Sequence, residues 1–126
     1  MSYIYNNNNF DKLDNKLKNL TSQLIKHNKI IVTLAVAKRV QQEVEHLITT
    51  AKKNSLHSLR TVKKDIFNQK LDPKIDKIKD KKDTVLAKLT TQLSKKYQNK
   101  SGGYTKILKL YKRAGDNATM VLLQLV

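Results

Sequence analysis

The residues of this sequence with the clearest chemistry are cations, which gather in two short stretches. Lysine binds a phosphate oxygen as a flexible point charge, and arginine binds it as a rigid fork. Tyr104 and Tyr111, within the second stretch, carry rings that can stack on unpaired bases, although core packing is the expected role of at least one of them. The candidate nucleic-acid-binding residues are Lys52, Lys53, His57, Arg60, Lys100, Tyr104, Lys106, Lys109, Lys112 and Arg113.

The charge balance of the whole chain points to the same chemistry. Among 126 residues, 26 Lys and Arg oppose 10 Asp and Glu, which gives a net charge of +16. A compact protein with this excess repels itself unless a polyanion is close, and nucleic acid is the commonest one, with an anionic membrane next. Only Arg39, Arg60 and Arg113 are arginines, so we expect binding by summed charge. The preference for Lys and Asn also indicates an AT-rich coding genome.

The other chemistry-bearing residues do not form a catalytic or metal-binding pattern. Glu43 and Glu45 point to different sides of one predicted helix. The Gly102-Gly103 pair lacks the preceding strand and following helix of a phosphate loop. The chain has no cysteine, and its three histidines fall on different predicted elements (His27, His46 and His57). We therefore expect no enzyme activity, cofactor, metal or small-molecule substrate.

Hydrophobic periodicity predicts helices over most of the chain. Leucines spaced by four, three and four residues predict a first helix over residues 10–27. The β-branched run Ile30–Val32 predicts a short strand, and Thr33 is the expected cap of a second helix that stops at Asn54. Ser55 is the expected cap of a third helix and Asp83 that of a final one. Between these two, residues 74–83 alternate in charge, which predicts either a solvated short helix or an extended loop.

The residue pattern of the C-terminal fifth of the chain predicts a β-hairpin. Its strands are Tyr104–Arg113 and Ala118–Val126, joined by a turn at residues 114–117. Simple alternation places Lys106 and Lys112 on one face and Lys109 and Arg113 on the other. These cations either protect an edge strand from aggregation or bind phosphates, and the pattern alone leaves both alternatives open.

The expected fold is α+β, with about four helices packed on a small sheet that contains the hairpin and the short strand near Ile30–Val32. We expect a flexible arm over residues 1–9 and a single domain over residues 10–126. The chain contains no apolar run as long as a membrane span, and residues 1–10 do not read as a secretory signal.

At this level of detail the sequence resembles a known family. The segment Gly102–Leu110, followed by Arg113, Gly115-Asp116 and the closing Leu125-Val126, is similar to the C-terminal signature of the seventeenth protein of the bacterial-type large ribosomal subunit, the bL17 family. The resemblance continues upstream and covers most of the chain, through Asn19-Leu20-Thr21, Thr33, Ala37-Lys38, Leu47-Ile48-Thr49, Ala51-Lys52, Leu56-His57 and Arg60.

This resemblance implies a structural α+β protein that binds large-subunit (23S-type) rRNA and neighbouring ribosomal proteins, near the exit side of the peptide tunnel. The expected location is the cytoplasmic ribosome of a bacterium with an AT-rich genome, or alternatively an organellar ribosome. A different class of function is a free, sequence-tolerant nucleic-acid-binding protein that acts off the ribosome. A peripheral membrane protein is the weakest alternative, because the basic helices lack interfacial aromatic residues except Phe10 and Phe67 at their ends.

Overall fold

The computed structural model describes residues 7–67 and 84–126, with side chains from residue 15 onward. Within these ranges a three-stranded sheet lies on three separate helices and one composite helical rod. The elements in chain order are α1 (Asn7–His27), β1 (Lys29–Thr33), α2 (Leu34–Lys52), α3 (Leu56–Lys64), α4 (Val85–Ala87), the π-helical segment η1 (Lys88–Leu93), α5 (Ser94–Lys96), β2 (Thr105–Lys112) and β3 (Thr119–Leu125).

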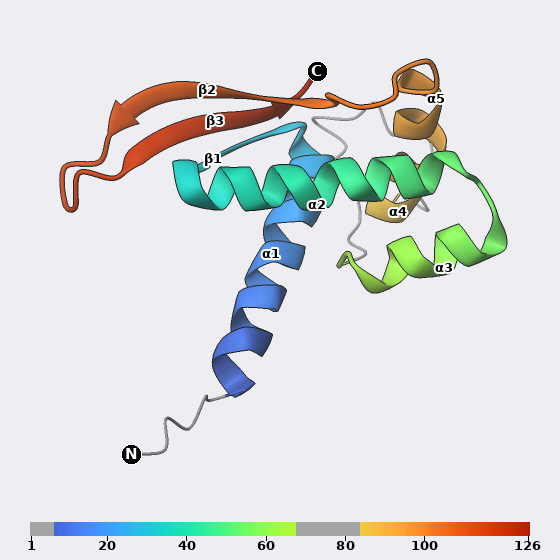
Figure 1. The fold of residues 1–126 in the computed structure, drawn as a ribbon, viewed down its shortest axis with the longest axis horizontal. Coiled ribbons are helices and arrows are strands. Elements are labelled where there is room, and N and C mark those ends of the chain that lie inside the picture. Colours follow the sequence, from blue (N-terminus) through green and yellow to red (C-terminus); the bar gives the residue numbers. More distant parts are fainter. Residues whose placement is uncertain (1–6, 68–83) are drawn as a thin grey trace.

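The sheet is antiparallel with the order β1-β3-β2, so the C-terminal hairpin and the short strand after α1 form one surface. Figure 1 shows α2 running beneath the sheet and α1 crossing below α2. The hairpin projects beyond the helices at one end of the long axis, and α3 and α5 lie toward the other. The α+β fold, the short strand and the hairpin are therefore confirmed.

Local signals account for most element boundaries. At Ser55 and Ser58 a reciprocal capping box begins α3, with the Ser58 amide donating to the Ser55 hydroxyl at 3.1 Å and the Ser55 amide to the Ser58 hydroxyl at 2.9 Å. Asn54, with φ 51°, takes the left-handed conformation between α2 and α3. Thr33 occupies the N-cap position of α2, as predicted, but its side chain makes no capping hydrogen bond.

Two boundaries differ from the sequence-based expectation. Helix α1 already includes Asn7, whereas the first helix was expected from residue 10 and residues 1–9 were expected as an arm; residues 1–6 lie outside the described residues. The last helical rod is capped by the Thr84 hydroxyl, which accepts from the Ala87 amide at 3.3 Å. The predicted cap, Asp83, and the charged segment 74–83 also lie outside the described residues.

The last helical rod contains a π-helical centre that periodicity did not predict. The Ser94 hydroxyl donates to the Leu89 carbonyl five residues earlier at 3.1 Å, and the Thr90 hydroxyl donates to the Leu86 carbonyl at 2.9 Å. Hydroxyls that bond back to the preceding turn compete with regular α-helical hydrogen bonding. Leu89, Leu93 and the following Tyr97 still reach the core, as their spacing predicted.

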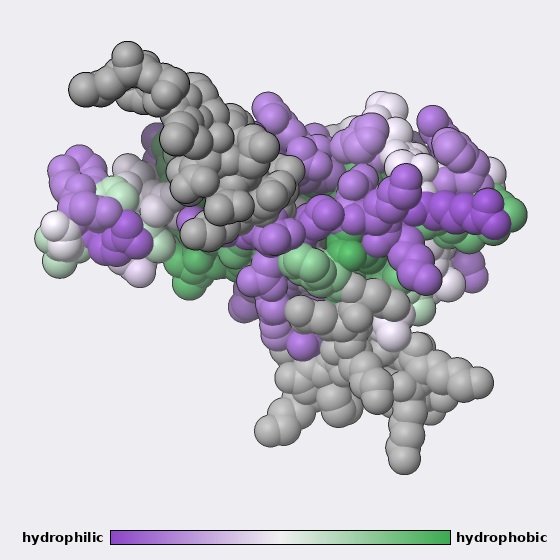
Figure 2. Space-filling model, turned by 90° about the horizontal axis from the view of Figure 1, so that it is seen from below, coloured by the Kyte–Doolittle hydropathy of each residue, from purple (hydrophilic) through white to green (hydrophobic). Residues whose placement is uncertain are grey.

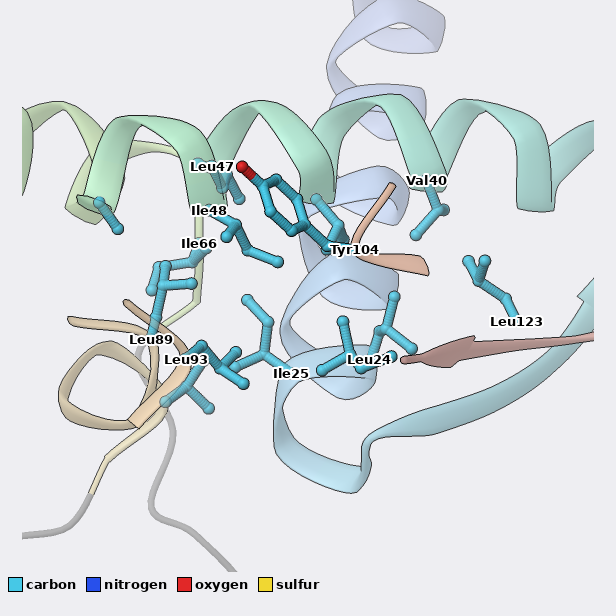
Figure 3. Packing of buried hydrophobic residues seen from close by; sticks show 14 of the residues in the cluster. Leu24, Ile25, Val40, Leu47, Ile48, Ile66, Leu89, Leu93, Tyr104 and Leu123 are labelled. Atoms are coloured by element: carbon cyan, nitrogen blue, oxygen red, sulfur yellow. The ribbon is translucent and has the colours of Figure 1, made fainter. Parts of the chain in front are cut away.

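The hydrophobic core lies between α2, α1, the last helical rod and the inner face of the sheet. Figure 3 shows Val40, Leu47 and Ile48 of α2 facing Leu24 and Ile25 of α1, with Leu123 entering from β3. Tyr104, immediately before β2, also points into this cluster with its hydroxyl toward α2. These side chains are almost completely buried, so the core fixes α2 against the base of the hairpin.

A β-bulge in β2 corrects the predicted faces of the hairpin. Lys109 pairs with Val121, but Tyr111 pairs with the next residue, Met120, so one extra residue sits in β2. The extra residue reverses the side-chain alternation beyond it. Lys112, opposite Thr119, therefore shares the helix-facing side with Lys109, and not the side of Lys106 as simple alternation predicted.

Candidate nucleic-acid interface

The first group of candidate cations, which we call the junction cluster, surrounds the corner between α2 and α3. Lys53, His57 and Arg60 are exposed there. Lys100 belongs here in space, although it precedes the hairpin in sequence, because the Lys52 ammonium donates a hydrogen bond to its backbone carbonyl. The cluster consists of Lys52, Lys53, His57, Arg60 and Lys100.

Within this cluster, the Lys52 side chain makes hydrogen bonds to other residues of the protein. Its ammonium also donates to the Tyr104 hydroxyl at 3.1 Å and lies 5.2 Å from the centre of the tyrosine ring. The Tyr104 hydroxyl in turn donates to the Lys100 carbonyl at 3.1 Å. Lys52, at the end of α2, thus ties this helix to the loop that enters β2, which makes its ammonium a structural group.

Tyr104 is a core residue in this structure. Its side chain has 0% exposure, and its ring packs on that of Tyr97 with centroids 5.0 Å apart. Hydrogen bonding with Thr49, and to a smaller degree the hydrogen bond and charge of Lys52, lower the pKa of the Tyr104 hydroxyl from its usual value, while burial opposes this change. Core packing, the alternative foreseen for one of the two tyrosines, applies to Tyr104, whose ring has no face open to a base.

The second group, which we call the hairpin cluster, lies along β2 and consists of Lys106, Lys109, Lys112 and Arg113. All four residues are exposed. The three lysines form no side-chain hydrogen bond or ion pair with the described residues. Since β2 is an edge strand of the sheet, its lysines can both discourage edge pairing and meet phosphates, and the edge position is compatible with either role.

Arg113 is held in place at the tip of the hairpin. Its Nε donates to Asp116 Oδ1 at 3.0 Å and its terminal nitrogen donates to Oδ2 at 2.6 Å. The same carboxylate accepts from the Ala118 amide at 3.2 Å. These bonds lower the pKa of Asp116 from 3.8 to about 2, with the Arg113 hydrogen bonds as the largest cause. A bidentate pair uses two of five guanidinium N–H groups, so the remaining edge of Arg113 can still donate to a phosphate.

The junction cluster and the tip of the hairpin, where β2 ends at Lys112, lie at opposite ends of the molecule, whereas Lys106 lies near the base of β2. Figure 1 places the α2–α3 corner at one end of the long axis and the hairpin tip at the other. Figure 2 shows hydrophilic side chains at both ends of the face seen from below. Within residues 15–67 and 84–126, Arg113 is the only candidate cation with an ion-pair partner, so the described residues leave most of the positive charge in these two regions uncompensated.

A further internal cation was not recognised in the sequence. Lys88 begins η1 and is 3% exposed, and its ammonium donates to the Lys26 carbonyl near the end of α1 at 3.4 Å. A cation is favourable at this position because carbonyl oxygens give a helix C-terminus partial negative charge. The sequence signal that could have identified Lys88 as internal was its position within the apolar pattern of Val85, Leu86 and Leu89, which predicted a buried helix face.

Other kinds of site are not found in the described part of the chain. Residues 7–67 and 84–126 contain no group of His, Cys, Asp or Glu side chains able to hold a metal ion. None of the helices in the same ranges is long and apolar enough to cross a membrane.

Comparison with known proteins decides the family. The family model described as ribosomal protein L17 matches residues 16–126, which include both clusters and the whole sheet. This chain belongs to the ribosomal protein L17 family. The resemblance seen in the hairpin signature is thereby confirmed.

Bacterial relatives of the L17 family cover nearly the whole chain. It is 44% identical to the large ribosomal subunit protein bL17 of Mycoplasma capricolum over 87% of this chain and 86% of the relative. Identity to the protein of the same name from Phytoplasma mali is 39% over the full length of both. The bL17 protein of Streptococcus pyogenes is 36% identical over 87% of this chain and 88% of its own length.

L17 proteins are structural constituents of the large ribosomal subunit and not enzymes. Membership of this family therefore confirms the prediction that this protein is not an enzyme. The role of each cation in RNA binding stays a prediction. The structure divides these residues into exposed cations at the two ends and internal groups, Lys52 and Tyr104, that support the junction.

Proposed function

We propose that this L17-family protein binds large-subunit rRNA at both ends of its long axis and so holds two RNA segments in a fixed relation. The junction cluster provides Lys53, His57, Arg60 and the Lys100 side chain, while Lys109, Lys112 and Arg113 provide the cations toward the hairpin tip. Lys106, at the base of β2 and on its other side, is not part of this RNA contact. Lys52 and Tyr104 keep the junction in the shape that presents these groups. Neighbouring ribosomal proteins complete its surroundings on the subunit.

The observation that carries this proposal is the uncompensated charge at both ends. The side chains of Lys53, Lys100 and the two lysines toward the hairpin tip are exposed and have no acidic partner among the described residues. Duplex RNA offers phosphates at a spacing that such a group of lysines can neutralise, and the released counterions supply the driving force. The relatives named above are bacterial, which favours a bacterial ribosome over an organellar one.

Charge reversal on the hairpin tests the proposal. Lys109→Glu combined with Lys112→Glu changes two exposed residues that share one side of β2. Arg113 is left intact because Asp116 holds it. We expect incorporation of the tagged variant into large subunits, measured by sedimentation through a sucrose gradient at high salt, to fall roughly tenfold or more.

The matched control is Lys63→Glu with Lys64→Glu, which makes the same change in net charge at the exposed end of α3, outside both clusters. If both variants lose incorporation equally, charge in general matters and the hairpin has no special role. Recovery of the parent protein with mRNA or DNA, and not with large subunits, would favour the free nucleic-acid-binding alternative.

A further inference from the structure

The sheet has a second face that none of the helices in the described part of the chain covers. Strand pairing places Val121, Leu123 and Leu125 of β3 on the buried side. In Figure 1 α2 lies on this side of the sheet, and no labelled helix lies above β2 and β3. The opposite side, which we call the open sheet face, is formed by the alternate residues of the three strands.

The register of the strands arranges the open sheet face in three rows. The first row is polar and consists of Lys29, Gln124 and Lys106. The second is entirely aliphatic, with Ile31, Leu122 and Leu108 side by side. The third row contains Thr33, Met120 and Tyr111, and Tyr111 belongs to it only because the bulge reverses the alternation in β2.

These apolar side chains form a continuous patch and are not scattered singly. Cross-strand neighbours on one face have Cβ atoms about 5 Å apart, within contact distance for side chains of this size. Ile31 is 55% exposed, Leu108 44% and Tyr111 57%. A contiguous apolar patch bordered by polar residues is a mark of a binding surface, whereas single exposed hydrophobic residues are ordinary.

We propose that the open sheet face is the docking site for a partner protein of the large subunit that presents an apolar helix or strand surface with carboxylates at one side. The charges of the face select this occupant. Lys29 and Lys106 border the aliphatic row, and no described carboxylate lies on the face. A partner with Asp or Glu beside its apolar residues meets both the aliphatic row and the two lysines.

Two other occupants fit the face less well. RNA would satisfy Lys29 and Lys106, but Ile31, Leu108 and Leu122 offer bases neither a hydrogen bond nor an aromatic surface, and only Tyr111 could stack. A second copy of this chain would bring together two molecules that each carry a net charge of +16, with no opposite charge to steer them.

Photo-crosslinking in the assembled particle tests this inference, which depends on the proposed place of the protein in the large subunit. A photo-reactive phenylalanine derivative replaces Leu108 in one variant, Ile31 in a second, and the exposed Leu56 of α3 in a control. Large subunits that contain each tagged variant are purified at high salt and irradiated, and the crosslinked peptides are identified by mass spectrometry.

We expect positions 108 and 31 to crosslink to the same ribosomal protein, through a peptide with Asp or Glu near an apolar run, and position 56 not to reach that peptide. Crosslinks from positions 108 and 31 only to RNA, only to a second copy of this chain, or to nothing would overturn the inference. Absence of the variants and of the parent from large subunits would instead contradict the proposed function.

A second measurement separates docking from folding. Leu108→Gln with Ile31→Gln should leave the melting temperature of the isolated protein almost unchanged, because both side chains are already exposed. The same double variant should weaken retention of the crosslinked partner on salt-washed subunits by at least about tenfold, and the Leu56→Gln control should not. Unchanged retention of the partner would overturn the inference as well.

Discussion

The junction and the hairpin are both rich in lysine, but the structure uses the two regions differently. At the junction the Lys52 ammonium donates hydrogen bonds to the Lys100 carbonyl and the Tyr104 hydroxyl. Along the hairpin Lys106, Lys109 and Lys112 remain exposed. The difference teaches that the number of cations in a stretch sets the attraction to a polyanion, whereas the packing around each cation decides whether its charge is available for binding.

The same contrast separates the two tyrosines of the C-terminal segment. Tyr104 has 0% exposure and Tyr111 has 57%. Tyr104 enters the core at the base of the hairpin, and Tyr111 stands on the open sheet face. Changes at these two positions therefore give the sharpest test of the comparison.

Tyr104→Ala should produce the largest effect on stability. It removes a buried aromatic ring and the hydroxyl that bonds to Lys52 and Lys100. We expect a loss of about 3–5 kcal/mol in the free energy of unfolding, measured by denaturant titration. Tyr111→Ala is the matched control and should change it by no more than about 0.5 kcal/mol. Equal effects at the two positions would break the comparison.

Lys52→Met should destabilise the protein by about 1–3 kcal/mol in the same titration. Methionine keeps much of the side-chain volume but leaves the Lys100 carbonyl and the Tyr104 hydroxyl without their charged donor. Lys109→Met removes an exposed charge that has no bonding partner among the described residues, so its effect should stay within about 0.5 kcal/mol. A neutral result for Lys52→Met would show that its internal hydrogen bonds contribute little.

For RNA binding, Lys109→Met should have a larger effect than Lys52→Met, the reverse of their order for stability. If roughly 8 phosphates are neutralised, the slope of log affinity against log salt for duplex RNA should be roughly −7. We expect Lys109→Met to reduce the magnitude of this slope by about 1, and Lys52→Met to leave it unchanged under conditions where the protein is folded. A loss of slope in Lys52→Met would place its ammonium among the phosphate-binding groups.

The smallest expected effect concerns acid and is confined to the hairpin tip. The pKa of Asp116 is about 2 in the folded protein, against 3.8 ordinarily. A lowered pKa means that the carboxylate stabilises the tip fully above pH 3.8, and that this contribution is lost as the pH falls through about 2. NMR titration of the Asp116 carboxyl carbon should give this low midpoint.

The variant Arg113→Lys serves as the reference for this titration. A lysine cannot reproduce the bidentate contact, so the midpoint of Asp116 should move up toward its ordinary value. The same midpoint in both proteins would mean that the Arg113 fork does not set the pKa of Asp116.

Much of the architecture was predictable because its determinants are local. Ser55 caps α3 and Asn54 separates it from α2, as their residue types indicated. The leucine spacing of α1 and the β-branched run of β1 led to the correct elements. Hydrogen bonds and periodicities within a few residues can be read along a chain, since they do not depend on how distant segments meet.

The candidate site was less predictable, because distant contacts decide its members. The Lys52 ammonium meets the carbonyl of Lys100 across 48 residues of chain. The bulge in β2 depends on the pairing with β3, and it transfers Lys112 to the other side of the strand. Neither contact has a sequence signature that periodicity or residue type would reveal.

By itself the sequence determined the net positive charge, the hairpin and the helix boundaries that short-range hydrogen bonding sets, and it contained the signature of the L17 family. Only the tertiary structure decided which cations face solvent, which tyrosine enters the core and which side of the sheet stays open. The physical reason is that total charge and local propensity belong to individual residues and their near neighbours, whereas burial exists only where segments remote in the chain pack together.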